Sequence, residues 1–240
     1  MIQKLQAELI SKKKLTENVY EFEFLCKNPG VIEYEAGQYM MLNIPKGLEK
    51  IKRLYSVFNF NEDKSKFIIV VKLIPDGIGS EYLTSLKEKD NVEFEGPAGM
   101  FLFNKNAKDK IFLATGTGIM PILSLIFSNV KNMKNKFILF WGLRKKSDIF
   151  YFNLLQQLAK NNKNFTFGIY ISKEEIGQNK NDLYSGRINT GVDKLFSEKQ
   201  INLINSEFYI CGNKLNVDSL KNYLIEKGIK AEDIKMEKFG

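Results

Sequence analysis

Short apolar segments alternate with polar turns through the first hundred residues. The segments are rich in β-branched and aromatic residues, which favour strands. Six strands are predicted: Gln6–Ile10, Val19–Leu25, Gln38–Ile44, Leu54–Phe60, Phe67–Ile74 and Asn91–Glu95. One helix, about Ser80–Glu88, follows from the helical spacing of its apolar residues. Six strands at this close spacing predict a small antiparallel β-barrel.

The pattern changes after the polar segment 104–110, which we interpret as the domain boundary. Beyond it, each apolar run is followed by a segment with helical spacing. The predicted strands are Ile111–Thr115, Lys136–Trp141, Phe165–Ser172 and Glu207–Cys211; the helices begin at Pro121 and lie near Phe150–Lys160, Val192–Phe196 and Val217–Lys227. This alternation implies right-handed crossovers and a parallel sheet. The predicted fold is therefore α+β with two domains: an antiparallel β-barrel in residues 1–104 and an α/β parallel-sheet domain in residues 105–240.

The second predicted domain is organised around Ile111–Leu125. Its apolar run is followed by a glycine turn, Thr115–Gly118, and by Pro121 at the expected first position of a helix. A strand, a glycine turn and a helix N-terminus direct several N–H groups to one point, which suits a phosphate. A structural turn is one alternative. A membrane span is another, because no charge falls between Lys110 and Lys131, but the internal glycines and proline favour the folded turn.

A second glycine turn enters the predicted helix of the first domain. It contains Gly77-Ile78-Gly79-Ser80, with Ser80 expected as the helix N-cap. Nearby, strand alternation places Arg53 and Tyr55 on one side and Ser56 on the other. An arginine fork suits a phosphate, and a tyrosine ring suits a flat heteroaromatic group. Two turns suited to phosphate in one chain predict two nucleotide-like ligands, or one such ligand in each domain. Alternatively, Arg53 could be an ordinary surface residue.

The amino-acid composition excludes several kinds of catalytic and metal site. The hydrophobic fraction is 44% and the charged fraction 27%, as in ordinary globular proteins. The chain has no histidine, and Cys26 and Cys211 form no Cys-x-x-Cys pair. Histidine triads, histidine metal sites and a four-cysteine cluster are thus excluded, no metal site is expected, and a bound cofactor is the favoured carrier of chemistry.

The net charge of +8 fits nucleic acid, anionic cofactors or an acidic protein partner. Lysine is spread along the whole chain, so we interpret most lysines as solvated surface and expect no nucleic-acid binding. The N-terminus lacks the apolar core of a signal peptide. We therefore expect a cytoplasmic monomer without membrane insertion.

Five motifs stand in a fixed order along the chain: Arg53-Leu54-Tyr55-Ser56, Gly77-Ile78-Gly79-Ser80, Gly116-Thr117-Gly118-Ile119-Met120-Pro121, Cys211-Gly212-Asn213 and Glu237-Lys238-Phe239. This ordered set resembles the ferredoxin–NADP reductase superfamily over essentially the whole chain. The resemblance implies an FAD-binding barrel in residues 1–104 and an NADP(H)-binding domain in residues 105–240.

The resemblance also implies residue roles. The flavin would be bound by Arg53, Leu54, Tyr55, Ser56, Ile78, Gly79 and Ser80, with Tyr55 against the isoalloxazine and Phe239 covering its face. The nucleotide diphosphate would lie on Gly116, Thr117 and Gly118, and the nicotinamide against Cys211 and Gly212. The residues nearest the chemistry would be Ser56, which hydrogen-bonds near flavin N5, Cys211, and Glu237, a polar or proton-relay group near Ser56.

The choice of nucleotide is predicted from residues further along the chain. No acidic residue stands about 20 residues after the glycine turn to bind a ribose 2′-hydroxyl. NADP-binding members of the family that the chain resembles carry Ser-Arg-Glu and Gly-Arg-Ile where this chain has Ser172-Lys173-Glu174 and Gly186-Arg187-Ile188. Ser172, Lys173 and Arg187, with Arg144, could surround a 2′-phosphate, which favours NADPH. The alternative is that these cations are solvated loop residues.

The predicted activity is that of a flavoprotein oxidoreductase in electron transfer: hydride transfer between NADPH and flavin N5, coupled to one-electron exchange with ferredoxin or flavodoxin. An acidic carrier would suit the basic surface. One alternative is an NAD(P)H-dependent reductase component of an oxygenase, or a free-flavin reductase. The other is a non-catalytic regulatory or assembly subunit.

Overall fold

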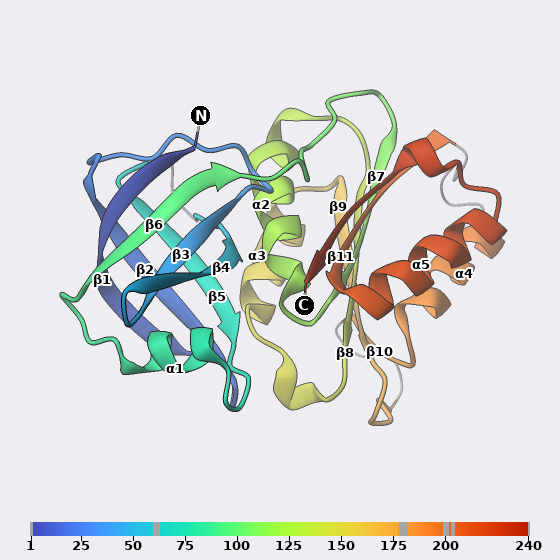
Figure 1. Ribbon diagram of the computed structural model, residues 1–240. Coiled ribbons are helices and arrows are strands. Elements are labelled where there is room, and N and C mark those ends of the chain that lie inside the picture. The colour runs from blue at the N-terminus through green and yellow to red at the C-terminus, as the bar shows by residue number, and fades with distance from the viewer. Residues whose placement is uncertain (1, 60–62, 178–181, 199–201, 203–204, 240) are drawn as a thin grey trace. The chain divides into compact units, whose positions relative to one another are not determined.

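The computed structural model describes residues 2–59, 63–177, 182–198, 202 and 205–239. The chain divides into two units (Figure 1). The first contains Met1–Phe103 with Leu123–Leu125, and the second contains Asn104–Ile122 and Ile126–Gly240.

An antiparallel sheet that curls around an aromatic core forms the first unit. Its strands are β1 (Gln3–Lys14), β2 (Val19–Asn28), β3 (Tyr39–Lys46), β4 (Glu49–Ser56), β5 (Lys66–Lys72) and β6 (Asn91–Ala98), in the order β4-β3-β6-β1-β2-β5. Phe24, Phe67 and Phe94 meet in the core with ring centroids 5.0–5.4 Å apart. Helix α1 (Ile78–Ser85) follows β5. The predicted antiparallel barrel is confirmed.

Strand β4 lies earlier in the chain than predicted. Its bounds are Glu49–Ser56, whereas the prediction was Leu54–Phe60, and Phe60 lies outside the described residues. A tight connection after β3 pairs Lys46 with Glu49, so the charged residues that follow belong to the strand. They are charged because β4 is an edge strand with an exposed face. Two of its lysines, Lys50 and Lys52, form ion pairs with glutamates of β6.

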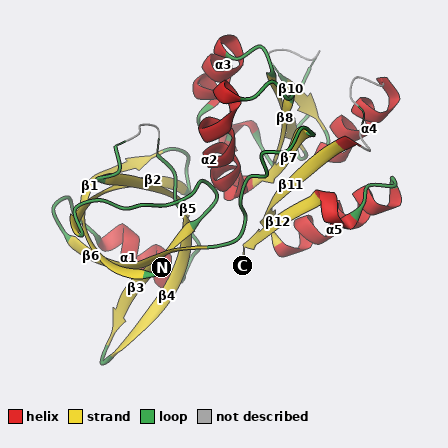
Figure 2. Cartoon of the chain, turned by 90° about the horizontal axis from the view of Figure 1, so that it is seen from above, coloured by secondary structure: helices red, strands yellow, loops and turns green. Residues whose placement is uncertain are grey.

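The second unit is a parallel sheet between two helical layers. Its strands are β7 (Asp109–Thr115), β8 (Phe137–Leu143), β9 (Phe165–Ile171), β10 (Leu183–Ser185), β11 (Ser206–Asn213) and β12 (Ile234–Phe239), in the order β10-β9-β8-β7-β11-β12. Its helices are α2 (Ile119–Asn129), α3 (Phe152–Asn161), α4 (Ile188–Glu198) and α5 (Lys214–Glu226). Helices α2 and α3 lie on one face of the sheet, and α4 and α5 lie on the other (Figure 2). The predicted α/β domain with a parallel sheet is confirmed.

Several element limits differ from the predictions. Strands β10 and β12, at the two sheet edges, were not predicted, because one is very short and the other has a single buried residue, Ile234. Helix α4 is longer than the predicted Val192–Phe196. The turn after β7 is already a 3-10 helix, η1 (Gly116–Gly118), so α2 begins at Ile119 and Pro121 is not its first residue.

The long uncharged stretch after Lys110 is divided between β7, η1 and α2. Helix α2 has 11 residues, far fewer than a membrane span requires. Among the described residues, no helix is both long and apolar enough to cross a membrane.

Candidate functional site

The strand order of the second unit reverses beside β7. From β7 the chain moves outward through β8, β9 and β10, and then returns to place β11 on the other side of β7. In open parallel sheets, ligands bind outside the carboxyl ends of the strands at such a switch point. The two motifs there are the Gly116–Gly118 turn after β7 and the Cys211-Gly212 pair near the end of β11. The topology therefore brings together two motifs that lie almost a hundred residues apart in the sequence.

The two glycines of the turn have different roles. Gly116 has φ +55°, a left-handed conformation that favours glycine, and a Cβ there would have no neighbour within 4 Å. Gly118 has an ordinary φ of −61°, but its Cα lies against β11. A Cβ on Gly118 would lie 2.6 Å from the Cys211 carbonyl carbon and 2.7 Å from the Gly212 nitrogen. Gly116 thus shapes the turn, and Gly118 lets α2 begin directly against β11.

Cys211 is fully buried on β11 and pairs in register with Ala114 and Glu237. Burial, together with the negative charge of Glu237, raises the pKa of the Cys211 thiol well above its ordinary value. The thiol is therefore neutral at physiological pH, which does not suit nucleophilic chemistry, and its contact with a nicotinamide stays a prediction.

Asn213 entered the sequence prediction only as part of a motif, without its capping role, and Asn216 next to this turn was not predicted. The Asn213 side chain caps α5 by accepting from the Asn216 N–H at 2.9 Å. Asn216 Nδ2 donates to Thr115 Oγ1 at 3.4 Å, and a Cβ on Gly212 would overlap the Thr115 hydroxyl. An asparagine directly before a helical segment is a capping signal that could have located Asn213. A second helix N-terminus, that of α5, therefore lies beside the end of β7.

Three cations follow the carboxyl ends of neighbouring strands. Arg144 comes after β8, Lys173 after β9 and Arg187 after β10, and all three side chains are exposed. Backbone bonds continue past the strand ends: the Lys173 N–H donates to the Arg144 carbonyl at 3.0 Å, and the Gly186 N–H to the Ile171 carbonyl at 2.8 Å. The predicted cations thus follow three adjacent strand ends at one edge of the sheet. Within the ranges that the structure describes, none of the three forms an ion pair.

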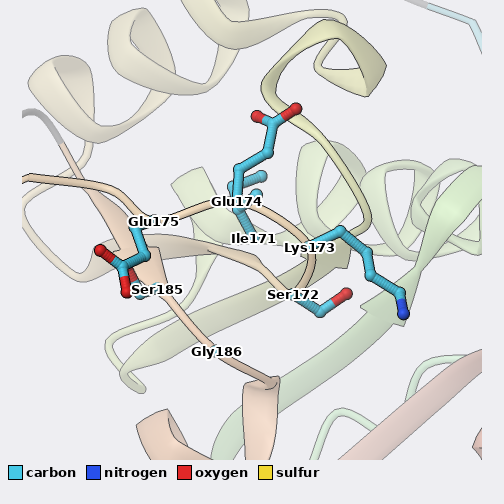
Figure 3. Close-up of a pocket in the computed structure, with 7 residues that line it drawn as sticks. All are labelled: Ile171, Ser172, Lys173, Glu174, Glu175, Ser185 and Gly186. Atoms are coloured by element: carbon cyan, nitrogen blue, oxygen red, sulfur yellow. The ribbon is translucent and has the colours of Figure 1, made fainter.

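A shallow pocket of about 370 Å³ lies at this edge (Figure 3). It is lined by Ile171, Ser172, Lys173, Glu174, Glu175, Ser185 and Gly186. The Ser172 hydroxyl donates to the Leu143 carbonyl at 3.2 Å, and Glu174 Oε2 accepts from the Lys146 N–H at 2.9 Å. Figure 3 shows both carboxylates pointing away from the Lys173 ammonium group. The pocket therefore offers a phosphate one exposed cation, Lys173, whereas the Ser172 hydroxyl proton is already donated to the Leu143 carbonyl.

The first unit places Arg53 and Tyr55 beside the start of α1. A Cβ on Gly79 would lie 2.5 Å from Tyr55 Oη and 3.3 Å from Arg53 Cγ, so both side chains lie on one side of β4, as predicted. Arg53 is exposed, and its Nη1 donates to the Lys52 carbonyl at 2.9 Å. Tyr55 packs against the barrel core, and burial raises its pKa to about 12, although Arg53 opposes the shift. The phenol is therefore neutral at physiological pH.

The predicted N-cap of α1 is wrong. The N-cap is Gly77, which offers no side chain, and Ser80 is the third helical residue. Its hydroxyl instead accepts from the Ile74 N–H at 2.8 Å and ties the helix to the preceding turn. Because the first N–H groups of a helix have no partner within it, the start of α1 remains suited to an anion beside the Arg53 guanidinium.

The remaining predicted residues lie in both units. In the first, Leu54 is exposed on β4 and Ser56 is buried at its end. In the second, Glu237 and Phe239 are partly buried on β12, paired with Cys211 and Asn213. Two predicted contacts would connect the two units: that of Glu237 with Ser56, and the stacking of Phe239 on a flavin. Both stay predictions.

The donor sets fit two dinucleotide ligands. In the first unit, the Cγ atom of Arg53 and the Tyr55 ring both lie beside Gly79 at the start of α1, a combination that suits a diphosphate attached to a flat ring. In the second, a glycine turn at the switch point fits a diphosphate, and the pocket that contains Lys173, with Glu174 and Glu175, lies at the same sheet edge.

Two protein families match the chain. Residues 6–103 match the oxidoreductase FAD-binding domain, and residues 112–218 match the oxidoreductase NAD-binding domain. Each match falls within one of the two units, apart from the short α2 segment that groups with the first.

Curated relatives include the F component of the Na(+)-translocating NADH-quinone reductase. The relative in Neisseria meningitidis serogroup C (strain FAM18) is 30% identical over 219 residues, covering 87% of this chain and 53% of the relative. The one in Klebsiella pneumoniae is 25% identical over 279 residues, covering 100% and 68%. The chain spans about half the length of the first of these relatives.

Solved structures share the fold. The cytochrome P450 reductase GcoB of Amycolatopsis superposes with a TM-score of 0.87 at 20% identity, covering 99% of this chain and 70% of that one. A ferredoxin NADP+ reductase from Neisseria gonorrhoeae, with bound FAD and NADP, gives a TM-score of 0.83 at 22% identity and covers 99% and 98%.

Proposed function

We infer the function from the premise that the chain belongs to the ferredoxin–NADP reductase superfamily, with one FAD-binding and one NAD-binding oxidoreductase domain. It is a flavin oxidoreductase. We propose that it exchanges electrons between NADPH and FAD and passes them to a separate acceptor protein. The proposal rests on one observation: each domain contains a segment suited to bind a diphosphate. In the first domain this is Arg53 with the start of α1, and in the second it is the turn at the switch point.

The chain's residues bind and orient the two ligands. Arg53 and the first N–H groups of α1 would hold the flavin diphosphate, and Tyr55 would present its ring to the isoalloxazine. The turn at Gly116–Gly118 would hold the nucleotide diphosphate while Cys211 contacts the nicotinamide. When bound, FAD would accept a hydride from the nicotinamide and release electrons singly. The neutral Tyr55 phenol and Cys211 thiol move no proton in this scheme; Ser56 and Glu237 are the groups proposed to do so.

An absorption spectrum gives the first test. The purified protein should be yellow or take up FAD stoichiometrically, and a colourless protein that cannot be loaded would remove the proposal. The Ser56→Ala variant then tests the site. It should keep FAD but reduce it more slowly with NADPH in single-turnover experiments, and an unchanged rate would remove Ser56 from its role.

NADPH is the proposed nucleotide because of Arg144, Lys173 and Arg187. The double variant Lys173→Ala/Arg187→Ala removes two of these charges. Each charge-assisted hydrogen bond contributes about 1.5–3 kcal/mol, so the Michaelis constant for NADPH should rise at least about tenfold while that for NADH changes little. The matched control, Lys160→Ala/Lys163→Ala, removes the same charge from the exposed end of α3 and should affect neither. Equal effects on NADPH and NADH would refute the 2′-phosphate role.

Ferredoxin or flavodoxin is the proposed acceptor because the net charge of +8 suits an acidic carrier. Its reduction rate should fall as salt increases. A second candidate, an NADH-dependent reductase component that serves a quinone or oxygenase system, is favoured by the likeness to the F component of the NADH-quinone reductase. Steady-state assays with NADPH or NADH against an acidic ferredoxin, a flavodoxin and a water-soluble quinone separate the two. Preference for NADH and quinone would replace the first candidate by the second.

A further inference from the structure

Trp141 is the only tryptophan in the chain, and its side chain is fully buried. It lies on β8 and pairs in register with Ala114, one residue before the end of β7. The ring packs edge-on against Phe150, with the centroids 5.0 Å apart and an interplanar angle of 80°. Its one polar group, the indole N–H, donates to the Gly116 carbonyl at 2.9 Å. A core residue is thus hydrogen-bonded to the glycine turn at the switch point.

The bond fixes the orientation of one peptide group. The Gly116 carbonyl also accepts from the Ile119 N–H, so it is held by the sheet core and by the start of α2 together. In a planar trans peptide, the C=O of one residue and the N–H of the next point in opposite directions. Holding the Gly116 carbonyl toward Trp141 therefore aims the Thr117 N–H away from the core.

The bond accompanies a left-handed conformation of Gly116. With φ at +55°, the chain turns out of β7 and presents its carbonyl to β8. Nothing lies within 4 Å of the position where a Cβ would stand, so a side chain here would be disfavoured by the positive φ and not by a close neighbour. The Trp141 bond, from the neighbouring strand, stabilises this conformation of the turn.

We propose that Trp141 is a positioning residue for the pyridine-nucleotide diphosphate: by holding the Gly116 carbonyl, it directs the Thr117 N–H at the ligand. The inference rests on the proposed nucleotide role of this turn. Trp141 acts on the diphosphate common to NADP and NAD, so it sets affinity for both and does not choose between them. That separates its role from the one proposed for Lys173 and Arg187.

Replacement of the indole N–H tests the proposal. Global substitution of tryptophan by benzothienylalanine changes position 141 alone and exchanges N–H for sulfur in a ring of similar shape; Trp141→Phe is the genetic counterpart. Isothermal titration calorimetry of the FAD-loaded protein should show dissociation constants for NADP+ and NAD+ that rise by the same factor. We expect about tenfold, the effect of losing about 1.4 kcal/mol. The FAD spectrum and the rate of flavin reduction at saturating NADPH should stay near wild type.

The control variant is Phe140→Leu. Phe140 is buried on the opposite face of β8, where it packs with the core under α4 and α5, so its loss reduces stability without touching the turn. It should leave both dissociation constants unchanged. The proposal is overturned if the benzothienylalanine protein binds as wild type does, or if Phe140→Leu weakens binding as much as Trp141→Phe. A wild-type protein that holds FAD but binds neither nucleotide would instead refute the proposed role of the turn, and with it this inference.

Discussion

Replacing Glu207 by Gln perturbs a buried ion pair in the second unit. Lys110 and Glu207 are neighbours on β7 and β11, and their side chains are 0% and 2% exposed. The Lys110 ammonium lies 2.8 Å from Glu207 Oε2, which also accepts from the Tyr209 hydroxyl at 2.8 Å. Asn104 Nδ2 donates to the other carboxylate oxygen at 3.1 Å. The carboxylate is therefore the common acceptor of this network.

Neutralising the carboxylate leaves the lysine charge buried without its counter-ion. Removal of one partner from a buried pair costs about 3–5 kcal/mol. At about 2–4 °C per kcal/mol for a chain of this size, Glu207→Gln should lower the melting temperature by roughly 6–20 °C. The triple variant Lys110→Met/Glu207→Leu/Tyr209→Phe removes both charges and the Tyr209 hydroxyl together, but it leaves the Asn104 N–H without the hydroxyl to which it donates at 2.9 Å. It should recover part of the loss, because apolar replacements of buried pairs are often neutral whereas an unpaired N–H is not.

Urea unfolding followed by Trp141 fluorescence measures this effect, because that tryptophan lies within the second unit. Far-UV circular dichroism on the same samples shows whether the first unit unfolds in the same transition. A loss below about 1 kcal/mol for Glu207→Gln would contradict the reasoning, since a surface pair would give that value. So would a triple variant that is as unstable as the single one.

The pair also predicts a pH dependence. Burial lowers the Lys110 pKa below its ordinary value, and the bond to Glu207 only partly opposes the shift. At pH values between the lowered pKa of the folded state and the ordinary pKa of the unfolded state, the unfolded chain binds more protons than the folded chain. The free energy of unfolding therefore gains a contribution that rises with pH as pH approaches 10.5, and Lys110→Met should lack it.

Two further predictions concern the flavin cradle and the thiols. Gly79→Ala places a Cβ 2.5 Å from Tyr55 Oη. The resulting overpacking of about 1–3 kcal/mol should weaken FAD binding about tenfold in titrations of the apoprotein. The control Gly30→Ala, where a Cβ meets nothing within 4 Å, should not weaken FAD binding, and equal effects of the two variants would contradict the role of the contact. Burial, with the charge of a nearby aspartate, raises the Cys26 pKa to about 11, and the Cys211 pKa is also raised, so iodoacetamide at neutral pH should modify neither thiol before urea unfolds the protein. Rapid modification of either thiol in the native protein would show that its burial is incomplete.

The segment 104–110 shows where a local pattern misleads. Its polar composition is typical of a linker, but Asn104 and Asn106 are hydrogen-bonding partners of the buried network at Glu207 and Lys110. Lys108 likewise forms an ion pair with Asp233. These partners lie about a hundred residues or more away, except for the contact between Asn106 and Lys110. No local pattern could therefore indicate that the segment is held by the second unit.

The fold class and the order of the motifs follow from local patterns in the amino-acid sequence. Strand alternation, helical spacing and turn residues act over a few neighbouring positions, so they can be read directly from the chain. The glycine turn after Thr115 and the Arg53–Ser56 motif were located in this way. Family comparison then identified the two nucleotide-binding domains.

The way in which these segments contact one another became apparent from the folded chain alone. It placed the ends of β7 and β11 side by side at a switch point, set Gly118 against Cys211, and joined the Trp141 indole to the Gly116 carbonyl. Each of these contacts depends on strand register and close packing between residues far apart in the sequence. Such contacts exist only when the sheet has assembled, and therefore local sequence patterns did not contain them.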